Sequence, residues 1–262
     1  MLKTAWHCNA APLDAASLAL RFHAVFLFLM RVAVLASGHG SNLQALLDAC
    51  AAPASAAHIV LVVSNREGAG ALERAGARGV PAATIAEDGQ DADRLLALLA
   101  EHAVELVVLA GYLKRVPDRV VAAYRGRMLN VHPALLPAFG GPGMYGRRVH
   151  EAVLASGARV SGATVHLVDE QYDHGPIVAQ WPVPVRPDDT PDTLAARVLA
   201  VEHRLLPAVV LACAARGGAA LAAAADATRA PLRPVARPAG VAPHSLDDAL
   251  VPSSPLPLKE RS

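Results

Sequence analysis

An amide and an imidazole stand two residues apart in the stretch LNVHPALLP, which runs from Leu129 to Pro137. The apolar residues around them predict a strand over residues 128–133, and residues i and i+2 of a strand point to the same side. We therefore expect Asn130 and His132 to project together from the carboxyl end of this strand, which Pro133 ends. An amide donor beside a titratable imidazole is suited to stabilising an oxyanion and moving a proton.

A carboxylate that could complete this pair is Asp173, in the loop segment DEQYDHG. If the fold brings Asp173 close to His132, its charge favours the protonated imidazole and holds the ring in one orientation. The alternative is a metal site formed by His132, His166, Asp173 and His174. Their spacing matches no ordinary ligand set, and His166 is equally well explained as a strand residue facing the core, so we expect no metal.

A glycine-rich turn joins an apolar run to an amphipathic run in LASGHGSNLQALLDAC, residues 35–50. Gly38 and Gly40 allow amides to point into the turn, and Ser41 and Asn42 are expected to cap the helix that follows. Free N–H groups at a helix start bind phosphate. A turn that merely connects two elements remains the alternative for this motif alone.

A dinucleotide site is disfavoured at the same turn. Leu43 stands where the third glycine of that motif is needed, and Asn65 and Arg66 end the next apolar run, where an acid should bind a ribose. This weighs against a nicotinamide-dependent oxidoreductase. A nucleotide-binding module without chemistry stays open as a further alternative.

Short β-branched runs alternate with helical patterns through the middle of the chain, which is typical of βαβ units. The sequence therefore predicts an α/β fold: an open, mainly parallel, Rossmann-like sheet with helices on both faces. Strands are expected at 31–36, 58–65, 81–86, 105–111 and 128–133, with helices at 42–52, 70–78, 91–102 and 118–124. A helix at 149–155 and two strands within 162–185 follow, and then a last helix that starts after Thr190, bends or breaks at Pro207 and ends at glycine.

Composition limits the classes of function and the domain organisation that the chain can have. The 262 residues carry 24 Lys plus Arg against 23 Asp plus Glu, so the net charge of +1 gives no general reason to bind nucleic acid or a membrane. Three cysteines lie far apart and suggest neither a zinc site nor a disulfide framework. We expect three parts: a dispensable extension over residues 1–29, a catalytic domain over 30–217, and an Ala/Pro-rich, mostly disordered tail over 218–262.

Five segments in collinear order resemble one family. They are SGHGSNLQAL, VLAGYLKRV, LNVHPALLPAFGG, GATVHLVDEQYDHGPIVAQ and VEHRLLP. From about Met30 to Gly217 the chain closely resembles the phosphoribosylglycinamide formyltransferases, enzymes of the formyltransferase fold. The resemblance implies formyl transfer from 10-formyltetrahydrofolate to the amine of glycinamide ribonucleotide in purine biosynthesis. It also implies small-molecule partners, no metal, no nucleic acid, no membrane, a monomer or homodimer, and a cytoplasmic location.

The same resemblance assigns roles to residues. The catalytic ones are Asn130, His132 and Asp173, and Glu202 contacts the glycinamide part. The phosphate turn is Gly40, Ser41, Asn42, Leu43 and Gln44. The folate site comprises Leu113, Lys114, Arg115, Val116, Asn130, Asp169, Glu170, Gln171, Tyr172 and Asp173. Gly76 and Pro142 depart from the family pattern, and their effect on folate binding is open.

Another formyl-folate enzyme, methionyl-tRNA formyltransferase or formyltetrahydrofolate hydrolase, is the alternative, since these share the HPxLLP region. The tail is not basic, as the extra domain of the tRNA enzyme usually is, and 29 residues are too few for the domain that usually precedes the hydrolase.

Overall fold

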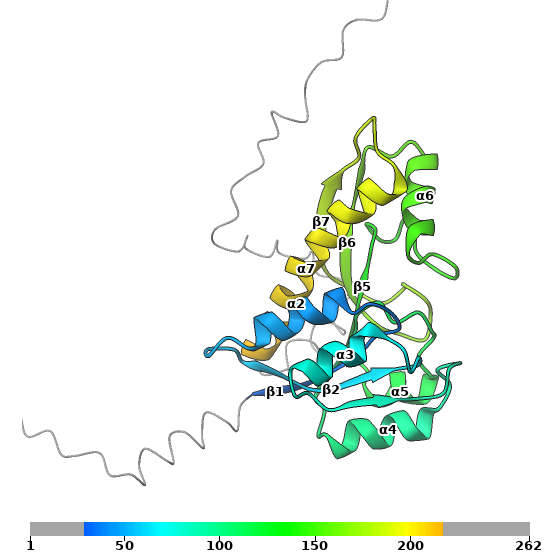
Figure 1. Ribbon diagram of the computed structural model, residues 1–262. Helices are drawn as coiled ribbons and strands as arrows, with labels where there is room; N and C mark the ends of the chain where they lie inside the picture. The colour runs from blue at the N-terminus through cyan, green and yellow to red at the C-terminus, as the bar shows by residue number, and fades with distance from the viewer. Residues whose placement is uncertain (1–28, 217–262) are drawn as a thin grey trace, which may run out of the picture.

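The structure is a computed structural model that describes residues 29–216 of the chain. Five strands alternate with four helices, and a helix, a strand pair and a long helix follow (Figure 1). In chain order they are β1 (Met30–Leu35), α2 (Ser41–Cys50), β2 (Ala57–Ser64), α3 (Gly70–Ala77), β3 (Ala82–Thr84), α4 (Ala92–Glu101), β4 (Leu106–Leu109), α5 (Asp118–Ala123), β5 (Met128–His132), α6 (Arg147–Ala155), β6 (Val160–Leu167), β7 (Ile177–Pro184) and α7 (Pro191–Ala215).

All seven strands form one sheet in the order β3-β2-β1-β4-β5-β6-β7. Strands β1 to β5 pair in parallel, whereas β6 pairs antiparallel with both β5 and β7. The mainly parallel sheet predicted from the sequence is thus confirmed. The direction of strand addition reverses between β1 and β4, and ligands of open α/β sheets bind beyond the carboxyl ends of the strands at such a switch point.

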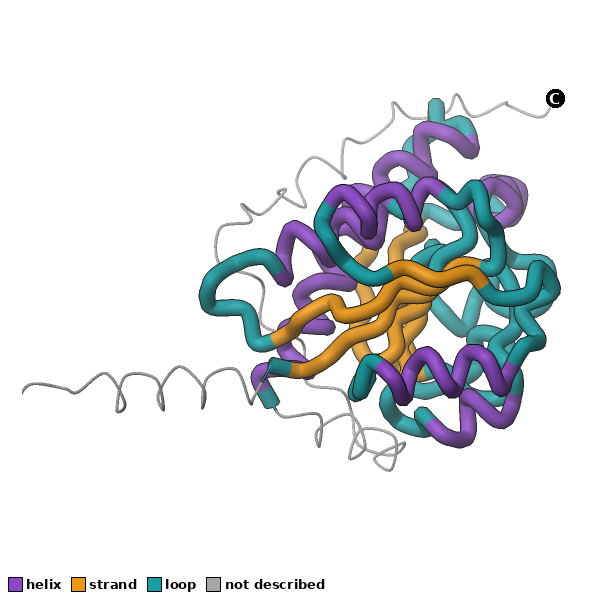
Figure 2. Tube along the Cα trace, turned by 60° about the horizontal axis from the view of Figure 1, so that its bottom comes forward, coloured by secondary structure: helices purple, strands orange, loops and turns teal. Residues whose placement is uncertain are grey.

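Helices cover both faces of the twisted sheet, as predicted (Figure 2). Along β1, Val32 and Val34 pack into one hydrophobic core, and Ala33 and Leu35 pack into the other. The first core also takes apolar side chains from α2, α3, α6 and α7, and the second takes them from α4 and α5. Because both faces are buried, the central strands are continuously apolar rather than alternating.

The last helix, α7, packs against α2, α6 and the strands β6 and β7. Its start follows the sequence prediction: the Thr190 hydroxyl caps the Thr193 N–H, and Pro191 occupies the first turn. The helix continues through Pro207, where we expected a bend or break. Length and composition would allow α7 to cross a membrane, but half of the apolar segment is buried inside this domain.

The predicted extension (1–29) and tail (218–262) lie outside the described residues apart from Leu29, so these parts stay predictions. Strand β7, which contains Pro182 and Pro184, is the last strand of the sheet, where proline is tolerated.

Candidate active site

Two neighbouring strands present polar side chains on one face at the open end of the sheet. In β5, Leu129 and Val131 enter a hydrophobic core, so Asn130 and His132 point to the opposite face. The antiparallel register of β6 sets His166 opposite Asn130 and Thr164 opposite His132. Directly opposite residues share a face, so two polar pairs stand side by side.

Asp173 reaches this group from the loop between β6 and β7. Its Oδ2 lies 3.5 Å from His132 Nδ1, and its Oδ1 lies 3.6 Å from His166 Nε2 and 3.5 Å from Asn130 Nδ2. The Gly141 N–H also donates to Oδ2 at 2.9 Å. The convergence of Asn130, His132 and Asp173 expected from the sequence is therefore what the structure shows.

The backbone at Asp173 is held in the left-handed region, with φ of 53°. This conformation is uncommon for residues other than glycine and costs free energy that surrounding contacts must offset. Gly175, two residues on, passes so close to β6 that a Cβ there would lie 1.9 Å from the Leu167 carbonyl oxygen. The loop is thus pressed against β6, which aims the carboxylate at His132 and His166.

Both ring nitrogens of His132 face oxygen atoms. Nε2 lies 2.9 Å from the Phe139 carbonyl oxygen and Nδ1 faces Asp173, an arrangement that only the imidazolium satisfies at both sites. Burial disfavours the charged imidazolium, because the His132 side chain is only 3% exposed. Burial lowers the pKa of His132 from its ordinary value, and Asp173 raises it by less. The expected effect of the carboxylate is present, but it is the smaller of the two.

The carboxyl group of Asp173 is ionised in this setting. Burial alone raises its pKa, but the bond to His166, the charge of His132 and the Gly141 N–H together hold it below the usual range. His166 is itself fixed because its Nδ1 lies 2.8 Å from the Leu167 carbonyl oxygen and its Nε2 lies 3.0 Å from the Asn130 amide nitrogen.

A second set of contacts fixes the chain just after His132. Thr164 donates to the Ala134 carbonyl at 2.6 Å and accepts from the Leu136 N–H at 3.1 Å. Gln180 of β7 donates to the Leu136 carbonyl at 2.9 Å and to the Thr164 hydroxyl at 3.0 Å. Sequence reasoning missed both residues and the positioning role of His166. Polar residues at alternate strand positions hint at these contacts. The contacts themselves depend on which residues of neighbouring strands lie opposite one another.

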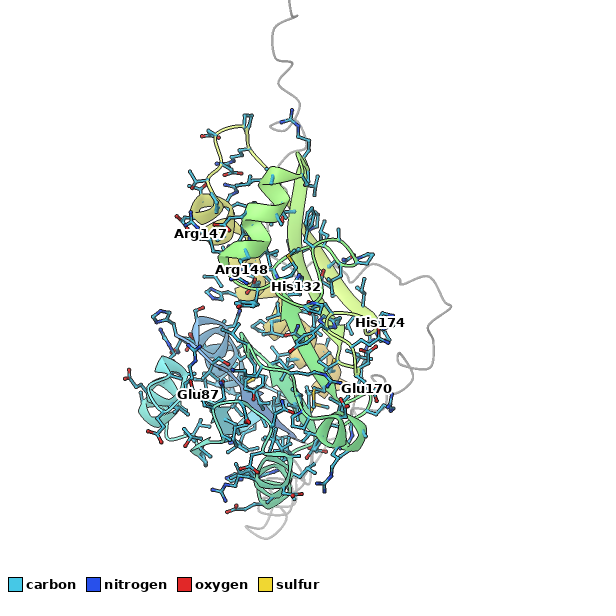
Figure 3. The ribbon with its side chains drawn as sticks, turned by 90° about the vertical axis from the view of Figure 1, so that its right-hand side faces the viewer. Glu87, His132, Arg147, Arg148, Glu170 and His174 are labelled. Carbon is cyan, nitrogen blue, oxygen red and sulfur yellow. The ribbon has the colours of Figure 1, made fainter. Side chains whose placement is uncertain are left out.

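Asn130, His132, His166 and Asp173 line a cavity of about 550 Å³. Figure 3 shows His132 near the centre of the molecule, with Arg148 of α6 on one side and Glu170 and His174 on the other. The lining includes both predicted folate segments, residues 113–116 and 169–173, and also Pro142 and Glu202, but not Gly76. Leu113 and Tyr172 are unusually exposed for large apolar side chains, at 41% and 45%. They offer an apolar surface at the cavity to a flat ring system.

Arginines hold the loop that carries Glu170. Arg115 donates to the Glu170 carbonyl at 2.9 Å and to Asp118 at 2.6 Å, and Arg125 pairs with the Glu170 carboxylate. Because Arg115 belongs to the first of the two predicted folate segments and Glu170 to the second, the two segments are directly connected.

The glycine turn differs in detail from the prediction. Gly40, with φ of 74°, is the N-cap of α2, and no side chain caps the helix. Capping by Ser41 or Asn42 was therefore wrong, because Asn42 turns inward and donates to Glu202 at 2.7 Å. The uncapped start leaves backbone N–H groups free, as a phosphate site requires. Leu43 is fully buried, and Arg74 donates to Gln44 at 3.1 Å and to the His39 carbonyl at 2.8 Å.

Glu202 belongs to the buried end of the cavity. Burial raises the pKa of this carboxyl group to about 7, and the hydrogen bond from Asn42 opposes the shift. Asn42 Oδ1 is buried without a hydrogen-bond partner. A carboxyl group that titrates near neutral pH, next to an unsatisfied amide oxygen, indicates a polar ligand here.

Residues 29–216 contain no group of three or more His, Cys, Asp or Glu side chains placed to hold a metal ion. His174, one of the four residues in the metal alternative, pairs with Asp169 at 2.9 Å instead.

A comparison with protein-family models matches residues 30–210 to formyl transferase. The chain belongs to the formyl transferase family. Its sequence is 45% identical over 186 residues to the chloroplastic phosphoribosylglycinamide formyltransferase of Arabidopsis thaliana, covering 69% of this chain and 64% of that one. To the Escherichia coli phosphoribosylglycinamide formyltransferase it is 39% identical, covering 69% of this chain and 85% of the relative. The chain thus spans less than two thirds of the plant relative.

This formyl transferase domain also resembles solved structures of phosphoribosylglycinamide formyltransferases. It resembles the phosphoribosylglycinamide formyltransferase of Brucella melitensis with a TM-score of 0.65 and 42% identity, covering 71% of this chain and 96% of that structure. It also resembles glycinamide ribonucleotide transformylase 1 of Symbiobacterium toebii, with a TM-score of 0.67 and 38% identity over 72% and 89% of the two chains.

Proposed function

We propose that the chain is a phosphoribosylglycinamide formyltransferase. It moves the formyl group of 10-formyltetrahydrofolate to the amine of glycinamide ribonucleotide, yielding formylglycinamide ribonucleotide and tetrahydrofolate. The observation that carries the proposal is the convergence of Asn130, His132 and Asp173 in one cavity that also reaches Glu202 and both folate segments. The similarity to enzymes of that name supports the choice of substrates.

The proposed placement of substrates follows the cavity. The phosphate lies on the turn of residues 40–44, against the N–H groups that remain free at the start of α2 and at the positive end of its dipole. The glycinamide end lies at Glu202, and the formyl-folate lies along residues 113–116 and 169–173. Holding both substrates in one cavity replaces a bimolecular encounter by a reaction within one complex.

Attack of the amine on the formyl carbon places negative charge on the former carbonyl oxygen. Asn130 and the Nε2 of His132 donate to this oxygen, which requires Nε2–H to leave the Phe139 carbonyl when substrates bind. The new charge favours the imidazolium, which burial alone disfavours. Asp173 stabilises that cation and takes up the proton released by the attacking amine, directly or through a water. Collapse of the intermediate then breaks the bond between the formyl carbon and the folate nitrogen, and this nitrogen leaves with the proton that the amine released.

Replacing His132 by alanine tests the assignment. Removing a donor to the oxyanion should lower kcat by about a thousandfold, with the fold checked by circular dichroism. His102→Ala, at the end of α4 and outside the cavity, is the matched control and should keep normal turnover. An absorbance assay of the folate with both substrates measures the rate. Near-normal turnover by His132→Ala would refute the catalytic role.

The comparisons give no support to methionyl-tRNA formyltransferase or formyltetrahydrofolate hydrolase. The same assay separates them. With this function the wild-type chain consumes formyl-folate only when glycinamide ribonucleotide is present, whereas a hydrolase consumes it alone. A cytoplasmic location, as a monomer or homodimer without a metal, completes the proposal.

A further inference from the structure

A third histidine, besides His132 and His166, lines the same cavity and takes no part in the mechanism above. His150 lies in the first half of α6 and is 4% exposed. Its Nδ1 is buried and has no hydrogen-bond partner within residues 29–216, whereas its Nε2 is not among the buried unpaired atoms. A buried polar atom without a partner is unfavourable, and native proteins seldom keep one without a reason.

The surroundings of His150 point to a ligand. The α7 residues that line the cavity are Ala195, Ala196, Leu199 and Glu202, and the first three offer no side-chain hydrogen bond. Among the side chains of α6 and α7 at the cavity, His150 and Glu202 can therefore bind a polar ligand, together with Asn42 of α2. Burial and the nearby His132 lower the pKa of His150, so the ring is neutral and can donate one hydrogen bond and accept one.

A sugar hydroxyl suits such a ring, because it also donates and accepts. In the proposed acceptor the ribose links the phosphate, held at the start of α2, to the amine, held near His132. The ribose must then cross the part of the cavity that Asn42, Glu202 and His150 line. We propose that His150 binds a ribose hydroxyl of the acceptor nucleotide through Nε2. This inference rests on the proposed function and adds a residue to its acceptor site.

Calorimetric titration of the full chain with glycinamide ribonucleotide tests the inference. His150→Phe keeps the size of the ring and removes its hydrogen bonds, and it should weaken acceptor binding by about tenfold. His150→Gln keeps one polar group at similar reach and should bind within about threefold of wild type. His102→Phe makes the same substitution outside the cavity and should leave affinity unchanged.

Acceptor analogues that lack the 2′ or the 3′ hydroxyl identify the contact. For one of the two analogues, His150→Phe should cause no further loss of affinity, because the partner of His150 is already missing. Equal losses with all three acceptors would overturn the proposal, as would wild-type affinity in a folded His150→Phe variant. If His150→Phe fails to fold, a tenfold loss in His150→Gln also overturns it. Failure of the wild-type chain to bind the acceptor would refute the proposed function instead.

Discussion

Glu202 is a buried carboxylic acid, and burial raises its pKa from the ordinary 4.5 of a glutamate to about 7. Between these values the folded chain binds a proton that the unfolded chain has lost, so its stability falls as pH rises through this window. Glu202→Gln is neutral at every pH. We expect it to raise the free energy of unfolding at pH 8 by about 3 kcal/mol at most.

Urea unfolding of both proteins at several pH values between 4.5 and 8 measures this difference. The gain should be nearly lost by pH 4.5, where Glu202 is protonated in the folded chain and half protonated in the unfolded chain, so the low-pH comparison is the internal control. A gain that does not change with pH would show that burial of the charge is not its cause. Acceptor binding should weaken in the same variant, since Glu202 lines the proposed acceptor site.

Residues that share one strand were the predictable part of the site. The common face of Asn130 and His132 follows from the period of two, which depends on local geometry alone. His166 joins them only through the pairing of β6 with β5. The residue pattern of one strand does not reveal which residues of the other strand lie opposite it. Asn42 looked like a helix cap because its partner, Glu202, lies 160 residues away.

At the scale of elements, the loop between β6 and β7 depends on Gly175. An added Cβ would collide with the Leu167 carbonyl oxygen, which belongs to backbone and cannot rotate away. Gly175→Ala should shift the loop and move Asp173 away from His132. We expect kcat to fall at least tenfold and the free energy of unfolding to fall by about 1–3 kcal/mol. Turnover and urea unfolding measure the two effects.

Gly76→Ala is the matched control for this substitution. Gly76 lies within α3 with open space where a Cβ would stand. Alanine there should leave turnover unchanged and stabilise the chain by about 0.5–1 kcal/mol, the helix preference of alanine over glycine. Normal turnover of Gly175→Ala would mean that the loop tolerates displacement, contrary to the geometry of the site.

Helices and strands could be predicted well because their signals are local. Apolar runs marked the strands, and caps and prolines marked the starts of helices, as at Thr190. The order of strands across the sheet and the antiparallel direction of β6 and β7 were beyond the sequence, since these depend on which distant surfaces pack together. Pro207 remains inside α7, where packing of the helix against one hydrophobic core outweighs its local preference.

At the scale of the molecule, both cores, the sheet and the cavity lie within residues 30–216. A chain cut to these residues should therefore fold and keep its activity, with kcat within about twofold and a free energy of unfolding within about 0.5 kcal/mol of the full chain. Side-by-side urea unfolding and turnover check this. An insoluble or inactive fragment would show that the flanking segments contribute to the domain.

The bond from Asn42 to Glu202 joins the first helix after β1 to the last helix of the domain. A ribosome makes α2 early and α7 after every other described element, so a nascent chain holds the proposed phosphate turn before the opposite wall exists. If the proposed function holds, newly made protein gains affinity for the acceptor only after α7 has emerged and docked. Synthesis that stops before Glu202 would leave the proposed acceptor site without this wall.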